Sequence, residues 1–300
     1  MKRNGFAAAL AAGILFGVGG TFAQFLFSRR GVAVEWLVPV RLLGAGGLML
    51  LLAAAWDRRA VLAVWRTPGD AAQLILFGIV GMMPVQYTYF AAIAASNTAT
   101  ATVLQYTAPA MVAVWLVLGS RRPPSPRDYA AVALALAGTF FLVTHGDFRA
   151  LSISPQALFW GLTSAAAAAF NAIQPAGLLR RHGAGSITGW GMLTGGIALS
   201  FLHPPWAVTG RWDATALWFL LFILTFGTLG AFYLYLRAVH LVGAQRSSLL
   251  VCAEPLTAAA LATLWLGTSF GGMDWLGTSC ILATIVLLAR DQRGQAEKVT

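Results

Sequence analysis

The amino-acid sequence predicts an all-α membrane protein with ten transmembrane helices, arranged as two inverted five-helix repeats around a central cavity. The chain of 300 residues is 58% hydrophobic and only 10% charged, whereas a soluble domain carries roughly 25% charged residues. Its apolar residues come in blocks of about twenty, the length that crosses the hydrocarbon core as a helix. The basic residues alternate between the two sides of these blocks, and the chain matches itself at a shift of 146 residues.

Ten apolar blocks are expected to form the spans. The first block follows a short basic start, which is typical of a signal peptide, but its apolar run is too long for one and further spans follow it. Short connections join the blocks and leave no room for a soluble domain. The expected spans are residues 5–27, 34–56, 71–94, 97–118, 127–145, 155–178, 186–203, 214–238, 244–266 and 272–290.

The orientation follows from the 20 lysine and arginine residues, because membrane proteins concentrate these residues in cytoplasmic loops. With the N-terminus in the cytoplasm, 15 of them fall inside, four fall outside, and Arg41 lies within a span. An odd number of spans would break this alternation. We therefore expect a multi-pass inner-membrane protein with both termini in the cytoplasm. The basic residues occur in ones, twos and threes between the blocks, so the net charge of +10 does not indicate nucleic-acid binding.

The internal match divides the chain into two halves, residues 1–146 and 147–300. Because each half holds five spans, the halves must cross the membrane in opposite directions. Inverted repeats of this kind recur in secondary transporters, with the substrate site near the midplane; a duplicated membrane protein without transport activity is the alternative. Gly81 meets Gly227 at this shift, but glycine matches are common by chance in such a composition; the pairs that carry the match are Tyr87 with Tyr233, Tyr89 with Tyr235, and Pro109 with Pro255.

Two charged residues lie deep within predicted spans. A carboxylate such as Glu254 costs at least ~2.5 kcal/mol at that depth, so it must be protonated, paired or facing a wet cavity. Glu254 is compatible with a proton carrier, with a partner for a substrate amine, and with a packed residue beside Pro255. Arg41 is compatible with binding a substrate carboxylate, with pairing to Glu254, and with reaching the outer headgroups by its long stem.

A second set of candidate residues is polar but uncharged. Lipid-facing amides are costly, so these side chains are expected to face the interior of the bundle. There they either line the cavity together or join helix to helix as single hydrogen bonds. The set comprises Gln86, Tyr87, Tyr89, Gln105, Tyr106, Asn171, Gln174, Tyr233 and Tyr235.

Pro109 and Pro255 occupy matched positions in the two halves. Proline within a helix removes a hydrogen bond and bends the chain. The pair is therefore compatible with two hinges for alternating access, and equally with two static kinks.

Two motifs resemble a known family. Gln105-Tyr106-Thr107-Ala108-Pro109 in the fourth span and Glu254-Pro255 in the ninth, together with two five-span halves, are similar to the drug/metabolite transporter superfamily, and more narrowly to its EamA-type branch. The resemblance implies a ten-helix bundle with a central substrate cavity, and a role in exporting amino acids or other metabolites. Members of this family often carry an acidic residue after the ninth span, where this chain has Gly267-Thr268-Ser269.

The predicted function is a secondary transporter that exports small metabolites, including aromatic or other apolar amino acids, by alternating access. A multidrug or cationic-compound exporter of the same superfamily is an alternative, as are an intramembrane enzyme and a channel. The four histidines are scattered, and no metalloprotease, hydrolase or phosphate-binding motif occurs. We therefore expect no catalytic residue, metal or cofactor. The expected partners are the solute and membrane lipid, and a monomer suffices because both repeats lie in one chain.

Overall fold

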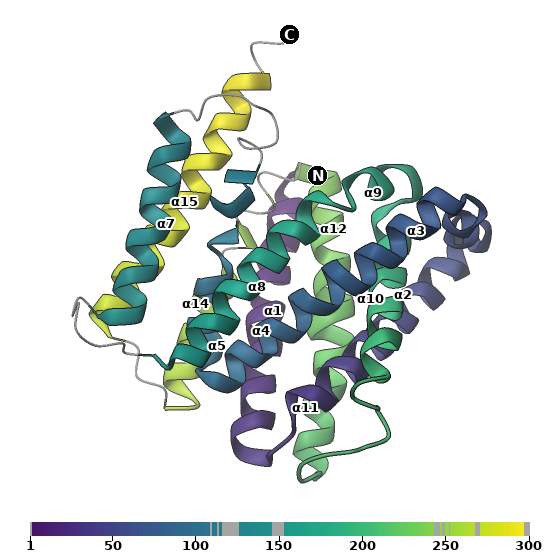
Figure 1. Cartoon of the computed structure of the whole chain (residues 1–300), viewed down its shortest axis with the longest axis horizontal. Helices are drawn as coiled ribbons and strands as arrows, with labels where there is room; N and C mark the ends of the chain where they lie inside the picture. The colour runs from purple at the N-terminus through teal and green to yellow at the C-terminus, as the bar shows by residue number, and fades with distance from the viewer. Residues whose placement is uncertain are drawn as a thin grey trace.

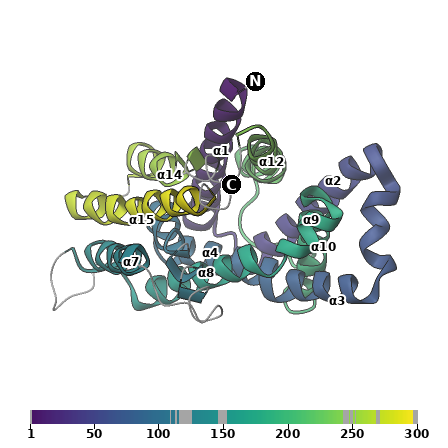
Figure 2. The same cartoon turned by 90° about the horizontal axis from the view of Figure 1, so that it is seen from above.

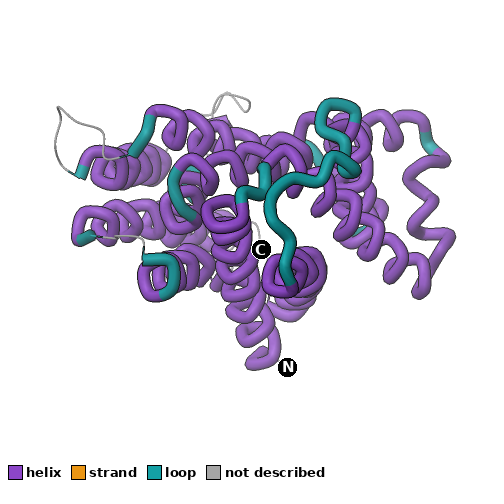
Figure 3. Tube along the Cα trace, turned by 90° about the horizontal axis from the view of Figure 1, so that it is seen from below, coloured by secondary structure: helices purple, strands orange, loops and turns teal. Residues whose placement is uncertain are grey.

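The computed structural model describes residues 2–108, 110–112, 114–115, 126–145, 153–242, 247, 250–251, 253–267 and 271–296. These residues form helices and connecting loops without a β-strand (Figure 3). The first half of the chain contains α1 (Lys2–Arg30), α2 (Val34–Ala63), η1 (Val64–Arg66), α3 (Pro68–Leu76), η2 (Phe77–Met82), α4 (Met83–Ala95), α5 (Thr98–Gln105) and α7 (Pro126–Thr144). The second half contains α8 (Pro155–Ile173), α9 (Ala176–His182), α10 (Ala184–Ser200), α11 (Ala214–Leu224), η3 (Thr225–Gly230), α12 (Ala231–Val242), α14 (Ala253–Leu264) and α15 (Gly272–Ala296).

Within the described residues, four helical segments are long and apolar enough to cross a membrane by length and composition. They are Asn4–Arg30, Val34–Arg66, Pro68–Ala95 and Ala214–Val242. A further apolar stretch, Val132–Phe141, is shorter. The structure is therefore that of an all-helical membrane protein, while the full count of ten spans and the inversion of the halves stay predictions.

Two of the long helical rods contain a π-helix near their middle. The first rod runs through α3, η2 and α4, and the second through α11, η3 and α12. The shift of 146 residues carries Gly81 onto Gly227, and each of these glycines lies within its own π-helix. A π-turn is wider than an α-turn and occurs often at functional sites. Both rods are thus widened at matching points of the sequence.

The helices of the two halves pack in a reciprocal pattern. α1 of the first half packs along α12 and α14 of the second, while α8 of the second half packs along α4 and α5 of the first. α2 pairs with α10, and α7 with α15. Figure 2 shows α7 and α15 at one side of the molecule and α2, α3, α9 and α10 at the other, with α1, α4 and α8 between them.

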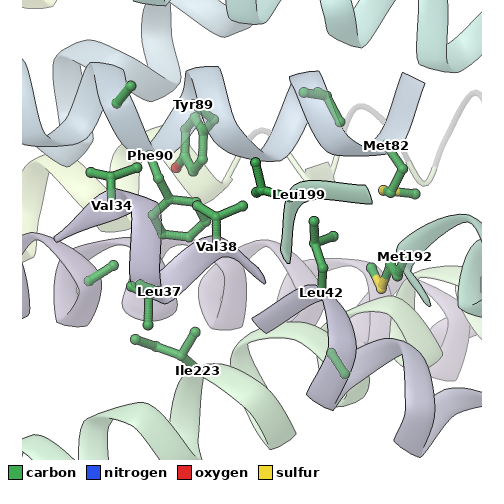
Figure 4. Close-up of a cluster of buried hydrophobic side chains, with 14 of the residues drawn as sticks. Val34, Leu37, Val38, Leu42, Met82, Tyr89, Phe90, Met192, Leu199 and Ile223 are labelled. Carbon is green, nitrogen blue, oxygen red and sulfur yellow. The ribbon is translucent and has the colours of Figure 1, made fainter. Parts of the chain in front are cut away.

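The main apolar cluster joins α2 and α4 of the first half to α10 and α11 of the second (Figure 4). Between helices in a membrane there is no hydrophobic driving force, so these side chains stabilise the contact through close van der Waals packing. The cluster therefore holds the halves together on one side of the molecule. Its largest labelled members are Val34, Leu37, Val38, Leu42, Met82, Tyr89, Phe90, Met192, Leu199 and Ile223.

The two predicted hinges have different outcomes. Pro109 lies outside the described residues. Pro255 lies in the first turn of α14, a place where helices tolerate proline. The hinge role of this pair stays a prediction.

Candidate functional site

A cavity of about 350 Å³ lies between the two halves. Its walls come from α1, α2, η2, α4 and α5 of the first half and from α8, α12 and α14 of the second. Eight residues that were candidates from the sequence line it: Arg41, Gln86, Tyr89, Gln105, Tyr106, Asn171, Tyr235 and Glu254. The apolar remainder includes Phe16, Met82, Val85 and Phe232. Polar groups from distant segments thus converge in one largely apolar hollow, as in small-molecule sites generally.

Arg41 is buried and firmly positioned. Its Nε donates a hydrogen bond to Thr228 Oγ1 at 2.8 Å, and its Nη1 donates to Gln86 Oε1 at 2.5 Å. The guanidinium carbon lies 4.7 Å from the centroid of the Phe90 ring, within the range of a cation–π contact. A buried charge is tolerated when it is hydrogen-bonded in this way. The guanidinium retains N–H groups that these contacts leave free for a solute.

Thr228 connects Arg41 to the π-helix of the other half. The Thr228 hydroxyl donates to the carbonyl oxygen of Ile223 at 2.7 Å, five residues back along the rod. Its oxygen therefore remains an acceptor for Arg41 Nε. Sequence reasoning missed Thr228, because a single threonine in an apolar span carries no distinguishing signal. Only the three-dimensional approach of η3 to α2 reveals its role.

Glu254 projects from α14 on the other side of the cavity. Its Oε2 accepts a hydrogen bond from the Tyr106 hydroxyl at 3.2 Å, and the same hydroxyl lies 3.1 Å from the carbonyl oxygen of Val251. Arg41 and Glu254 both line the cavity, but no direct ion pair joins these two described side chains. The cavity thus holds one basic and one acidic side chain, each supplied by a different half.

The remaining polar side chains that line the cavity differ in whether their polar atoms have hydrogen-bond partners. Gln105 Nε2 donates to Ser164 Oγ at 2.7 Å, and the hydroxyls of Tyr89 and Thr102 share a 2.8 Å hydrogen bond. Asn171 Oδ1 is buried and has no hydrogen-bond partner. Buried polar atoms are nearly always paired, so this oxygen is an open acceptor beside the cavity.

Three candidates lie away from the cavity. Tyr87 donates to Glu35 Oε1 at 3.4 Å and stacks on His203. Gln174 donates from Nε2 to the carbonyl oxygen of Gln73 at 3.0 Å. Tyr233 is 58% exposed on the outside of α12. Helical geometry explains the two tyrosines, because residues two apart do not share a helix face whereas residues three apart do. Tyr89 and Tyr235 therefore face the cavity while the matching Tyr87 and Tyr233 turn away.

The described residues offer no site for a metal ion. No three of their His, Cys, Asp or Glu side chains gather in a way that would hold one. Nor does a Ser–His or paired-carboxylate arrangement accompany Glu254 among the residues that line the cavity.

Comparison with known proteins identifies the chain. The model of the EamA-like transporter family matches residues 3–144 and again residues 155–290. A Salmonella typhimurium protein named "uncharacterized inner membrane transporter YicL" is 38% identical over 297 residues, which cover 98% of each chain. A Bacillus subtilis protein named "uncharacterized transporter YwfM" is 25% identical over 257 residues, covering 83% of this chain and 82% of the relative.

A crystal structure also shares the fold. It superimposes with a TM-score of 0.61 and 19% sequence identity, covering 95% of this chain and 98% of the other. Family and relatives together make this chain a protein of the inner membrane that transports rather than catalyses. The chain belongs to the EamA-like transporter family.

Proposed function

We propose that this transporter exports small zwitterionic metabolites of the amino-acid type, including aromatic or other apolar amino acids, by alternating access. The observation that carries the proposal is the cavity itself, in which Arg41 and Glu254 present opposite charges from the two halves. A free amino acid bears a carboxylate and an ammonium group on one carbon. It would bridge two side chains that do not reach each other directly.

The walls of the cavity suit the rest of such a solute. Arg41 would bind the carboxylate with the guanidinium N–H groups that Gln86 and Thr228 leave free. Glu254 would accept the ammonium group, and Asn171 Oδ1 would supply a further acceptor. The aromatic lining residues Phe16, Tyr89, Phe232 and Tyr235 would enclose an apolar side chain.

The proposed architecture is ten spans in two inverted five-helix halves. Three findings support it: the family model matches each half separately, the two π-helices occupy matching sequence positions, and the helices pack reciprocally between the halves. The distribution of lysine and arginine supports cytoplasmic termini. With that orientation, α1 ends and α11 begins at the outer face, while α3 begins and α9 ends at the inner face.

A second solute class has its own support. Arg41 is already hydrogen-bonded to two side chains and lies over Phe90, which leaves Glu254 as a carboxyl group that could accept a cation without Arg41 taking part. One carboxylate among aromatic rings favours a cation, so a cationic drug-like compound is the alternative solute. The two classes differ in what they require, because an amino acid needs both charges whereas a cation needs only Glu254.

Uptake into proteoliposomes tests these proposals. Uptake of labelled amino acids and of monovalent organic cations is measured for the wild-type chain and for the variants Arg41→Gln and Glu254→Gln, with and without a pH gradient. For the amino-acid proposal we expect saturable uptake that both variants reduce at least tenfold. Tyr233→Phe is the control, because Tyr233 is exposed away from the cavity. Amino-acid uptake at the wild-type rate in both variants would overturn the assignment, and cation uptake that only Glu254→Gln abolishes would establish the second class.

A further inference from the structure

We infer that two clusters of charged side chains at opposite ends of the molecule are the gates of the transporter. Arg30 with Asp213 forms one gate, and Asp70 with Arg181 and His182 forms the other. The inference rests on the proposed alternating access between the two halves, because each cluster joins the first half of the chain to the second. A full transport cycle then requires each gate to open while the other stays closed.

The first cluster closes the end of the molecule where α1 ends and α11 begins, called the α1–α11 end below. Arg30 Nη2 lies 2.7 Å from Asp213 Oδ2, and the guanidinium carbon lies 5.0 Å from the centroid of Phe25. A backbone hydrogen bond joins the same two segments, since Arg211 N donates to the carbonyl oxygen of Arg30 at 2.8 Å. One ion pair thus lies where the loop before α11 meets the end of α1.

The second cluster lies where α3 begins and α9 ends, called the α3–α9 end below. Asp70 Oδ1 accepts from Arg181 Nη2 at 2.6 Å, and Asp70 Oδ2 pairs with His182 Nε2 at 2.7 Å. The Asp70 and His182 side chains are only 14% and 12% exposed. Arg181 Nη2 also reaches Gln73 Oε1 at 3.5 Å. Both carboxylate oxygens of Asp70 are therefore used in holding the halves together.

The two clusters are built from corresponding elements with the halves exchanged. Arg30 lies in the last turn of α1, and Arg181 lies in the last turn of α9, which follows α8 after two residues. Asp213 is the N-cap residue of α11, and Asp70 lies in the first turn of α3. Each cluster thus pairs a basic helix C-terminus with an acidic helix N-terminus. Figure 1 shows the start of α11 at the lower edge of the molecule and α9 near the upper right.

The acidic partners stand at the start of the rods that form the cavity wall. α3 leads through η2 into α4, which carries Gln86 and Tyr89, and α11 leads through η3, which carries Thr228. A rod that pivots when its ion pair separates therefore moves side chains that line or support the cavity. By contrast, the described pair of His145, just after α7, with Asp274 of α15 also joins the two halves but lies outside the cavity wall.

The strength of such contacts suits a gate. Charges at helix ends are complementary to the helix dipole, which explains their presence but not their pairing across the halves in both clusters. An ion pair that remains partly exposed contributes little, so it shifts a two-state equilibrium by about two- to fivefold. Contacts of this strength are able to close an end of the molecule and still separate in every transport cycle.

A labelling experiment tests the gates without any solute. Cys252 and Cys280 are replaced by serine, and Ala168→Cys places a single thiol in the cavity wall. A membrane-impermeant maleimide is applied to right-side-out and inverted vesicles. We expect Asp213→Asn to raise labelling from the outside and Asp70→Asn to raise labelling from the inside, each by about two- to fivefold.

Two controls keep the test independent of folding and of the solute. Asp57→Asn removes an acid whose Oδ1 accepts from the backbone N–H groups of Arg59 and Ala60, so it should leave both labelling rates unchanged. Arg30→Gln should raise labelling from the outside as Asp213→Asn does, because it removes the same ion pair while Asp213 keeps its N-cap bond from Ala216 N. Equal labelling changes on both faces, or no change in either variant, would overturn the gates. If the two variants raise labelling from opposite faces as expected but the protein takes up no amino acid, the gate assignment stands. Only the proposed solute is then rejected.

Discussion

The two ends of the molecule are joined in different ways. At the α1–α11 end, the loop before α11 lies on the connection between α1 and α2 through a backbone bond from Arg211 to Arg30. The indole of Trp36 also donates to the carbonyl oxygen of Pro205 at 2.8 Å. At the α3–α9 end, every polar contact across the halves that the described residues show involves a side chain: Asp70 pairs with Arg181 and His182, and Gln174 Nε2 donates to the carbonyl oxygen of Gln73 at 3.0 Å. The first end is therefore the more firmly closed, and we expect the second to open more readily.

A glycine substitution should show the largest difference between the ends. Gly210 has φ +84°, and a Cβ there would lie 2.8 Å from Val32 N, whereas Gly183 has φ +80° with no atom within 4 Å of a Cβ. Backbone strain should lower the free energy of unfolding by about 1–3 kcal/mol in both Gly210→Ala and Gly183→Ala. In Gly210→Ala the free energy of unfolding should fall by about 1–3 kcal/mol more, because the backbone must shift to admit the methyl group. Thermal unfolding in detergent measures both, and equal losses would contradict the tighter packing of the α1–α11 end.

Two tryptophans allow a matched comparison of single hydrogen bonds. Trp36 Nε1 donates to Pro205 O at 2.8 Å near the α1–α11 end, and Trp190 Nε1, whose ring contacts Trp65 just before α3, donates to Val61 O at 2.9 Å near the α3–α9 end. Trp36→Phe and Trp190→Phe should each lower the free energy of unfolding by about 0.5–1.5 kcal/mol. In the labelling assay, Trp36→Phe should also raise access from the outside, while Trp190→Phe should not. The same outside access in both variants would remove Trp36 from the closure of this end.

The acidic gate residues should differ in their effect on stability. Asp70 has two side-chain partners and is 14% exposed, whereas Asp213 has one ion-pair partner and is 52% exposed. We therefore expect Asp70→Asn to lower the melting temperature more than Asp213→Asn does. Thermal unfolding of both variants at pH 7 measures the difference. The reverse order would show that burial and partner number do not govern these contacts.

The smallest expected effect is that of pH on the α1–α11 end. The backbone N–H of Ala216, followed by Arg30, holds the pKa of Asp213 below its ordinary value of 3.8. Because the ionised form is favoured in the folded state, its stabilisation is fully present above pH 3.8 and is lost as pH falls through the lowered pKa. The difference in melting temperature between wild type and Asp213→Asn should stay constant from pH 7 to pH 5 and shrink below pH 3.8. A difference that already shrinks between pH 7 and 5 would show that another group controls this contact.

The sequence predicts the lining of the cavity better than it predicts the ends. Arg41 and Glu254 attract notice because a charge within an apolar span needs a reason, and both line the cavity. The matched Tyr-x-Tyr pairs mark the right helices, but Tyr87 and Tyr233 lie on the opposite face from Tyr89 and Tyr235. The exact phase of a helix decides such faces, and a π-turn changes that phase without any clear sequence signal.

The gate residues could not be assigned in advance for a different reason. In the sequence, Arg30 and Arg181 are two of the 20 basic residues whose distribution indicates only which side of the membrane a loop occupies. Their partners, Asp213 and Asp70, are 183 and 111 residues away along the chain. Contacts over such distances depend on how the halves pack. The order of residues along a single chain does not reveal that packing directly.

The paired π-helices also bear on the ancestry of the fold. An extra residue in a helical turn arises most simply by insertion of one codon, and each half of this chain carries a widened turn around its matching glycine, Gly81 and Gly227. The self-match at a shift of 146 residues runs through both turns without a gap. A single insertion before the gene doubled explains this more simply than two insertions afterwards. The ancestral five-helix protein would then have paired with a second copy that already had its widened turn.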